Sequence, residues 1–305
     1  MGTYNNNAFR SFNAVATADL RNYLTDVHTG MTSSGWAVAS DTGQIDEATI
    51  TNPGSAATPL GYRMYYLDDS QHGTYPIYLK RTYAMSTSSA SRMRADIQIG
   101  VSTNGAGTFT NGVLGTLRTL YSGGTGNVPS AGTFAYIGSY GEGYATVLEG
   151  NGMWSGSSNY PCPLISVARE FDQTTGVPAT NGNFTFAVAE CTASTYPGGT
   201  HVSGYNRQFM KEYVFSLSST LGYYNSFVPM TMAVSGTTVE LFSHVYRTRK
   251  AVINPALMSY LTTDVATDNT VTADVLGVSR TYRATGVKYA TTASTSTYSL
   301  AILWE

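Results

Sequence analysis

Hydrophobic and polar residues largely alternate along this chain, in short runs separated by Gly, Asn, Asp and Pro. Clear examples are residues 76–83, 92–101 and 184–191. A period of two predicts β-strands with one buried face, and the residues between the runs are typical of tight turns. No regular alternation of strands with helices is present, which argues against a doubly wound α/β fold. The sequence therefore predicts a mainly β protein with antiparallel sheets, arranged as a β-sandwich or in a jelly-roll-like way.

Two segments have the helical period instead. The first is 17–28, where Thr17 is a candidate N-cap and Gly30 lies just past the expected end. The second is 254–263, where Asn254-Pro255 gives an N-cap followed by a first-turn proline. The apolar stripes are Leu20, Tyr23, Leu24 and Val27 in the first segment, and Leu257, Tyr260 and Leu261 in the second. We therefore expect one or two short helices beside the sheets.

Further strands are expected on both sides of a Gly/Ser-rich stretch at 122–132. They include 44–50, a hairpin formed by 134–140 and 144–148, and a long turn at 172–183. We expect residues 1–14 to form an extended N-terminal arm. Residues 15–305 then form the β-rich body, with 122–132 as the candidate boundary between two packed subdomains.

Composition limits the classes of partner. Only 12% of the 305 residues are charged and the net charge is −2, whereas nucleic-acid-binding proteins usually carry a basic face. We therefore expect no nucleic-acid partner. No run of about 18 apolar residues is present, which predicts no membrane span. With 23 Tyr and 31 Gly, the chain is expected to have many turns and an aromatic, weakly charged surface.

Candidate chemical groups are few, and each has a structural interpretation. The segment Gly100–Gly107 is glycine-rich but lacks the Lys-Ser/Thr and the following helix of a phosphate-binding loop, so tight turns are favoured. Glu142 and Glu149 are an alternative as a glycosidase pair. Cys162 and Cys191 are expected to be free thiols, with a disulfide as the alternative. We expect no enzyme activity, no catalytic residue, no metal and no cofactor.

Tyrosines gather in two regions, 62–83 and 196–224. Alternation turns some of them inward and others outward, and outward tyrosines on a weakly charged surface suit protein interfaces or stacking on sugar rings. Protein contact is favoured over carbohydrate. The candidate interface residues are Phe9 and Phe12 in the arm, with Tyr196, Tyr205, Tyr223 and Tyr224 in the second aromatic region.

Three motifs carry a family resemblance. A Tyr-rich alternating strand, Tyr75–Tyr83, precedes a strand that ends in an Asn-Gly-x-Gly corner, Asp96–Gly107, and Gly277–Tyr282 follows an Asn/Thr-rich strand. This pattern resembles virion structural proteins of tailed bacteriophages. The resemblance implies a component of the tail, baseplate, neck or fibres, and it transfers no catalytic residue.

The sequence thus leads to one main hypothesis and three alternatives. The main hypothesis is a non-enzymatic virion component, assembled in the host cytoplasm, whose partners are further copies of itself and other virion proteins. The alternatives are a receptor- or glycan-binding module of the virion, with a host surface glycan as partner, a virion-associated hydrolase, and a capsid decoration protein.

Overall fold

The protein is described from a computed structural model. The described residues are 2–12, 17–51, 59–86, 89–112, 118–122, 132–151, 164–172, 174–191, 208–216, 219–224, 241–247, 251–261, 269–275, 278–290 and 298–304. Within these ranges the chain forms two sheets of mainly antiparallel strands and one helix, α1 (Thr17–Thr32). The prediction of a mainly β, antiparallel fold is therefore confirmed.

Sheet B has six described strands, in the order β2-β3-β4-β5-β6, with β7 also paired to β5. They are β2 (Trp36–Val38), β3 (Pro59–Leu67), β4 (Tyr78–Ser86), β5 (Ser89–Thr103), β6 (Phe109–Gly112) and β7 (Arg118–Ser122). Each central strand pairs with its neighbour along the chain, so the strand pair expected from residues 76–101 is confirmed as β4 and β5. The expected strand at 44–50 is wrong, because this segment forms turns. Ile45 and Ile50 are nevertheless buried, which explains the apolar signal.

Sheet A has twelve described strands, in the order β1-β8-β9-β10-β11-β12-β17-β18-β15-β14, with β13 on β12 and β16 on β17. They are β1 (Gly2–Phe12), β8 (Gly132–Gly141), β9 (Tyr144–Asn151), β10 (Leu164–Arg169), β11 (Phe184–Cys191), β12 (Gln208–Ser216), β13 (Ser219–Tyr224), β14 (Leu241–Arg247), β15 (Ala251–Leu261), β16 (Thr270–Val275), β17 (Val278–Ala290) and β18 (Tyr298–Leu303). The expected hairpin after Gly132 is confirmed as β8 and β9. Along the chain, sheet B ends at β7 and the next strand, β8, belongs to sheet A.

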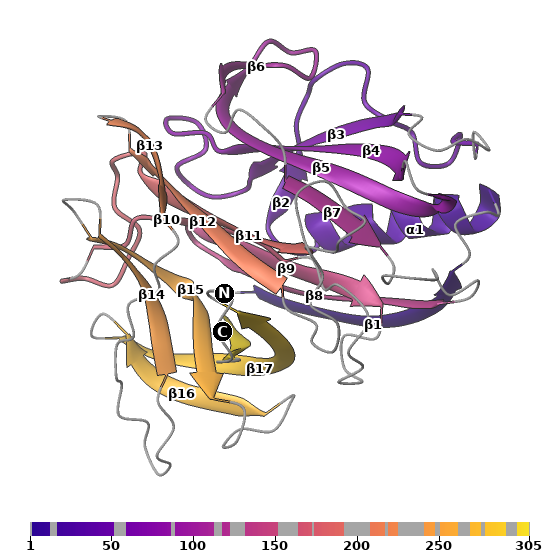
Figure 1. Ribbon diagram of the computed structural model, residues 1–305. Helices are drawn as coiled ribbons and strands as arrows, with labels where there is room; N and C mark the ends of the chain where they lie inside the picture. Colours follow the sequence, from indigo (N-terminus) through magenta and orange to yellow (C-terminus); the bar gives the residue numbers. More distant parts are fainter. Residues whose placement is uncertain are drawn as a thin grey trace.

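Sheet A consists of two parts that meet at β12 and β17. These strands pair in parallel through Gln208–Tyr289 and Phe209–Ala290. In Figure 1, β14 to β17 lie at the lower left, away from sheet B and α1. A second link lies at a loop after β10, where the buried Arg280 of β17 donates from Nη2 to the Gly176 carbonyl over 2.8 Å.

The helix α1 confirms the first helical prediction and is four residues longer than expected. It lies between sheet B and the β1–β8 side of sheet A (Figure 1). Its apolar stripe is fully buried and extends by one turn to Met31, so burial continues past Gly30, where the end was expected. The stripe consists of Leu20, Tyr23, Leu24, Val27 and Met31.

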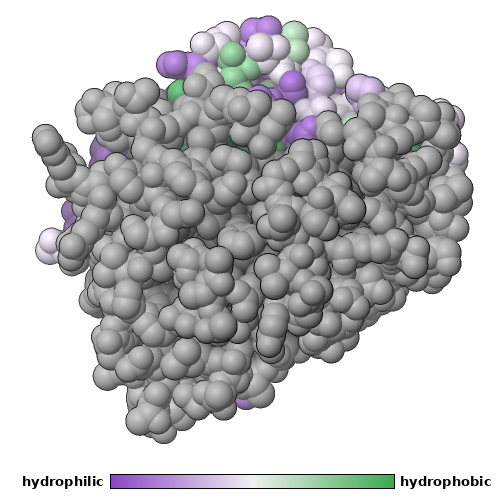
Figure 2. Space-filling view, viewed as in Figure 1, coloured by the Kyte–Doolittle hydropathy of each residue, from purple (hydrophilic) through white to green (hydrophobic). Residues whose placement is uncertain are grey.

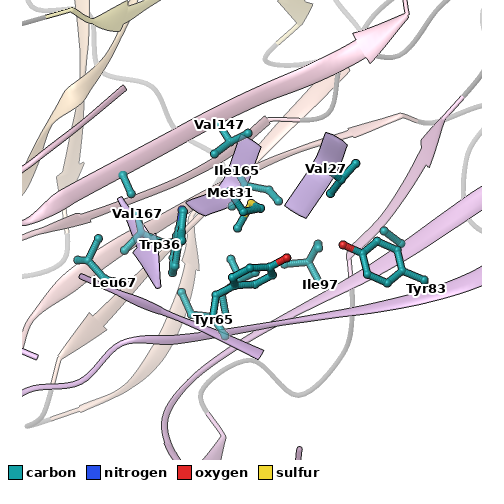
Figure 3. Packing of buried hydrophobic residues seen from close by; sticks show 14 of the residues in the cluster. Val27, Met31, Trp36, Tyr65, Leu67, Tyr83, Ile97, Val147, Ile165 and Val167 are labelled. Carbon is teal, nitrogen blue, oxygen red and sulfur yellow. The ribbon is translucent and has the colours of Figure 1, made fainter. Parts of the chain in front are cut away.

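The main core lies where α1, sheet B and sheet A meet. Figure 3 shows Val27 and Met31 of α1 among side chains from both sheets. Sheet B contributes Trp36, Tyr65, Leu67, Tyr83 and Ile97, and sheet A contributes Val147, Ile165 and Val167. Burial of this kind contributes roughly 25 cal/mol per Å² of apolar surface, so this layered contact is a main source of stability.

The second predicted helix is wrong. Residues 251–261 form strand β15, which pairs on one side with β14 and on the other with β18. The tertiary pairing therefore overrides the local helical pattern. Pro255 lies where the β14 register breaks: Met258 pairs with Ser243 and Asn254 with His244, so residues 255–257 have no partner in β14. A proline is tolerated at such an irregular position because no ladder hydrogen bond to β14 is lost.

Candidate functional site

The best-described candidate surface is the outer face of sheet B, the face that points away from α1. Strand alternation sends Tyr65 and Tyr83 inward, where both are fully buried. The same alternation turns Tyr62 and Tyr66 of β3, and Tyr78 of β4, outward, and these three are half-buried. The expectation that some of the first group of tyrosines are core and others face outward is therefore confirmed for these five.

Three rings pack together on this outer face. Tyr66 and Tyr78 are cross-strand partners, with ring centroids 6.5 Å apart in an edge-on arrangement. His72, from the loop between β3 and β4, stacks on Tyr66 with centroids 3.8 Å apart and meets Tyr78 edge-on at 5.8 Å. Burial lowers the pKa of His72, against the opposing effect of Asp69 and Asp68. The ring cluster therefore favours a neutral imidazole.

Lys80 lies beside the ring cluster on the same face. Its Nζ is 4.6 Å from the centroid of the Tyr62 ring and donates to the Gly107 carbonyl over 2.6 Å. Burial lowers the pKa of Lys80, while the Asp41 carboxylate opposes this shift. The ammonium is therefore already engaged by a ring and a carbonyl oxygen.

The glycine corner, residues 100–107, borders this face. The buried Asp41 holds it: its Oδ1 accepts from the Gly107 N–H over 2.8 Å, and its Oδ2 accepts from Thr103 Oγ1 over 3.0 Å. Gly105 and Gly107 have φ angles of 75° and 76°, in the left-handed region that favours glycine. The structural interpretation of this segment is confirmed at these two glycines, since both have turn conformations and the N–H groups of Gly105 and Gly107 donate to Thr103 and Asp41 of the protein itself.

The opposite end of the face is held by a buried ion pair between the two sheets. Asp69, in the loop after β3, accepts from Arg169 Nε over 2.5 Å and from Arg169 Nη2 over 2.8 Å. Both side chains are fully buried, and Nη2 also donates to the Tyr75 carbonyl over 2.9 Å. A bidentate pair of this geometry fixes direction as well as distance, so the loop that carries His72 is attached to β10.

Glu142 makes a second contact with the same loop. Its carboxylate accepts from the Ser70 N–H over 3.2 Å and from the Ser70 hydroxyl. Glu142 lies in the turn between β8 and β9, and Glu149 lies within β9 opposite Tyr136. The described contacts of Glu142 are therefore those of a residue that attaches one loop to another.

The predicted interface residues fall in parts where side chains are not described. Phe9 and Phe12 are in β1, and Tyr223 and Tyr224 are in β13. Tyr196 and Tyr205 lie outside the described residues, as does Cys162, while Cys191 is the last residue of β11. These residues, and the state of the two cysteines, stay predictions.

Two features are absent from the described ranges. Among the described residues, no three His, Cys, Asp or Glu side chains gather as a metal site requires. No described helix is both long and apolar enough to cross a membrane.

The top of Figure 2 corresponds to the region around β6 in Figure 1. There, hydrophilic and near-neutral residues surround small hydrophobic spots.

Comparison with known proteins gives no relative. The chain matches no family model, no curated protein and no solved structure.

Proposed function

We propose that this chain is a non-enzymatic structural component of a tailed-phage virion, in the tail, baseplate, neck or fibres. It acts there as a homo-oligomer that contacts other virion proteins. Two things support the proposal: the resemblance of three motifs to such proteins, and a body made of large sheets.

The observation that carries most weight is the use of polar groups around the outer face of sheet B. Asp41 binds the glycine corner, Arg169 binds Asp69, and Glu142 binds Ser70. Each of these groups holds one segment of the protein against another. Rigid segments suit a protein that offers a fixed surface to its neighbours, because a preorganised surface loses less conformational entropy on binding.

The test is to locate the chain on particles. Virions are purified on a density gradient from producing host cells, peptides of the chain are measured by mass spectrometry, and bound antibody is located by immunogold electron microscopy. We expect the chain to co-purify with particles and to be labelled at the tail, neck or fibres. Labelling over the whole head would favour a capsid decoration protein. A stable monomer that is absent from particles and has no affinity for them would contradict the proposal.

One observation favours a second candidate, a receptor- or glycan-binding module. Tyr66, His72 and Tyr78 form a half-buried ring cluster on the outer face, and aromatic rings stack on sugars. On a glycan array, we expect a signal that Tyr78→Ala removes and Thr74→Ala, an exposed change in the adjoining loop, retains. A signal that both variants retain would place any glycan site elsewhere, and no signal from the wild type would count against this candidate.

A further inference from the structure

The first strand has an unusual place in the topology of sheet A. Among the described strands of this sheet, every strand except β1 pairs antiparallel with a strand next to it along the chain. Of the strands that the structure describes, β1 pairs with β8 alone, and α1 and all described strands of sheet B lie between the two in the sequence. Figure 1 shows β1 at the edge of the sheet, below α1. Among the described strands, β1 therefore belongs to no hairpin and is held in sheet A by its ladder with β8.

This topology makes release of β1 a local event. Because β1 belongs to no hairpin, its release leaves the other strand pairs of sheet A intact. The same ladder can then form with β8 of a second copy, residue for residue, so the pairing lost in one molecule is regained in the other. In the sequence, β1 and α1 are separated by residues 13–16 alone.

The register argues for exchange rather than addition of another strand at the free edge. Asn6 pairs with Tyr136 and Arg10 with Phe134, so residues 7–9 face Ala135 alone. Such an irregularity bends an edge strand and discourages a further strand from pairing with it. The ladder with β8 itself is continuous on both sides of the break, at residues 2–6 and 10–12. β1 also contains no proline and a single charged residue, Arg10, so its composition does not oppose pairing with β8 of a second copy.

We propose that β1 is exchanged between copies of this chain, with β1 of one molecule completing the edge of sheet A at β8 of the next. The partner is a second copy, because its β8 offers the same residues, in the same register, as β8 of the first molecule. The inference rests on the proposed structural role, since it names how copies join. An exchange that closes gives a dimer or ring, and one that does not close gives a linear assembly.

The test uses full-length chains with one added cysteine each. Ser11 and Thr133 are direct partners in the β1–β8 ladder, and cross-strand partners lie within the Cα separation that a disulfide needs. Ser11→Cys protein is mixed with Thr133→Cys protein, incubated, oxidised and run on non-reducing gels, with peptide mass spectrometry of the link. The control mixes Ser11→Cys with Thr270→Cys, an exposed change in β16. Each variant oxidised alone reveals any link made by the native cysteines.

We expect a heterodimer linked between positions 11 and 133, several-fold more abundant than any link in the control. The Ser11→Cys/Thr133→Cys double variant is run beside the mixture. If it closes only within single chains while the mixture stays monomeric, β1 remains in its own molecule and the inference is wrong. If it forms no link at all, the β1–β8 pairing is absent and the inference again fails. Particle location is read separately: a chain that is present on virions without exchange overturns only this inference, and exchange in a chain absent from virions overturns only the proposed function.

Discussion

Replacing Gly107 with alanine should destabilise the protein far more than the same change at Gly105. The two glycines lie in the same corner and have nearly identical backbones, with φ angles of 76° and 75°. They differ in the room that the surrounding atoms leave for a Cβ. A Cβ at Gly107 would lie 2.5 Å from Cε2 of Tyr62 and closer still to its Cζ and hydroxyl oxygen, whereas a Cβ at Gly105 would meet nothing within 4 Å.

The magnitudes follow from this difference. Left-handed backbone costs a residue with a Cβ roughly 1–2 kcal/mol, and both variants incur it. Overpacking adds about 1–3 kcal/mol at Gly107 alone. Tyr62 cannot move away without loss, because its hydroxyl donates to the Thr42 carbonyl and its ring contacts the Lys80 ammonium. We therefore expect a loss of about 1–2 kcal/mol for Gly105→Ala and about 2–5 kcal/mol for Gly107→Ala.

Urea unfolding, followed by circular dichroism and tryptophan fluorescence, measures both variants. Tyr62→Ala removes the ring that the new methyl group would strike, so the double variant Gly107→Ala/Tyr62→Ala should lose less stability than the sum of its single changes. The difference between the loss in the double variant and the sum of the two single losses measures the clash between the new methyl group and the Tyr62 ring. The reasoning is refuted if Gly105→Ala and Gly107→Ala cost the same within about 0.5 kcal/mol, or if the double variant is simply additive.

Two other predictions concern buried and half-buried charges. Asp69→Asn leaves the buried Arg169 guanidinium without its carboxylate and should cost about 3–5 kcal/mol in urea unfolding, whereas the exposed Asp68→Asn should stay within about 0.5 kcal/mol; equal losses would contradict the role of the pair. Burial lowers the folded-state pKa of His28 and of His72 below the ordinary value of 6.5. Below about pH 6.5 the unfolded chain then binds more protons at these histidines than the folded chain does. Their contribution to the free energy of unfolding should therefore be fully present above about pH 6.5 and be lost as the pH falls below it. Urea unfolding across this pH range should show a smaller loss of unfolding free energy in His28→Gln and in His72→Gln than in the wild type. A wild-type unfolding free energy that does not change with pH would count against this assignment.

Much of the fold was predictable because most of its strands can be recognised from their own residues. Alternating residues and glycine turns define β3, β4, β5 and β11, since each strand places one face on the core shared with α1 or the other sheet. β15 was mistaken for a helix because its apolar residues are spaced by three and four. Its structure is decided by pairing with β14 and β18. These strands are separate segments of the chain, and the residues of β15 alone do not reveal the pairing.

The groups that hold the outer face of sheet B could not be predicted for a related reason. Asp41 and Gly107 are 66 residues apart, and Asp69 and Arg169 are 100 apart, so no local spacing links either pair. Both contacts nevertheless act on one surface: the first holds the glycine corner beside Tyr62 and Lys80, and the second holds the loop that carries His72. Because both ends are held by buried carboxylates, the rings between them lose little freedom when a partner binds. The outward tyrosines of β3 and β4 therefore lie on a surface whose two ends are already fixed by contacts within the protein.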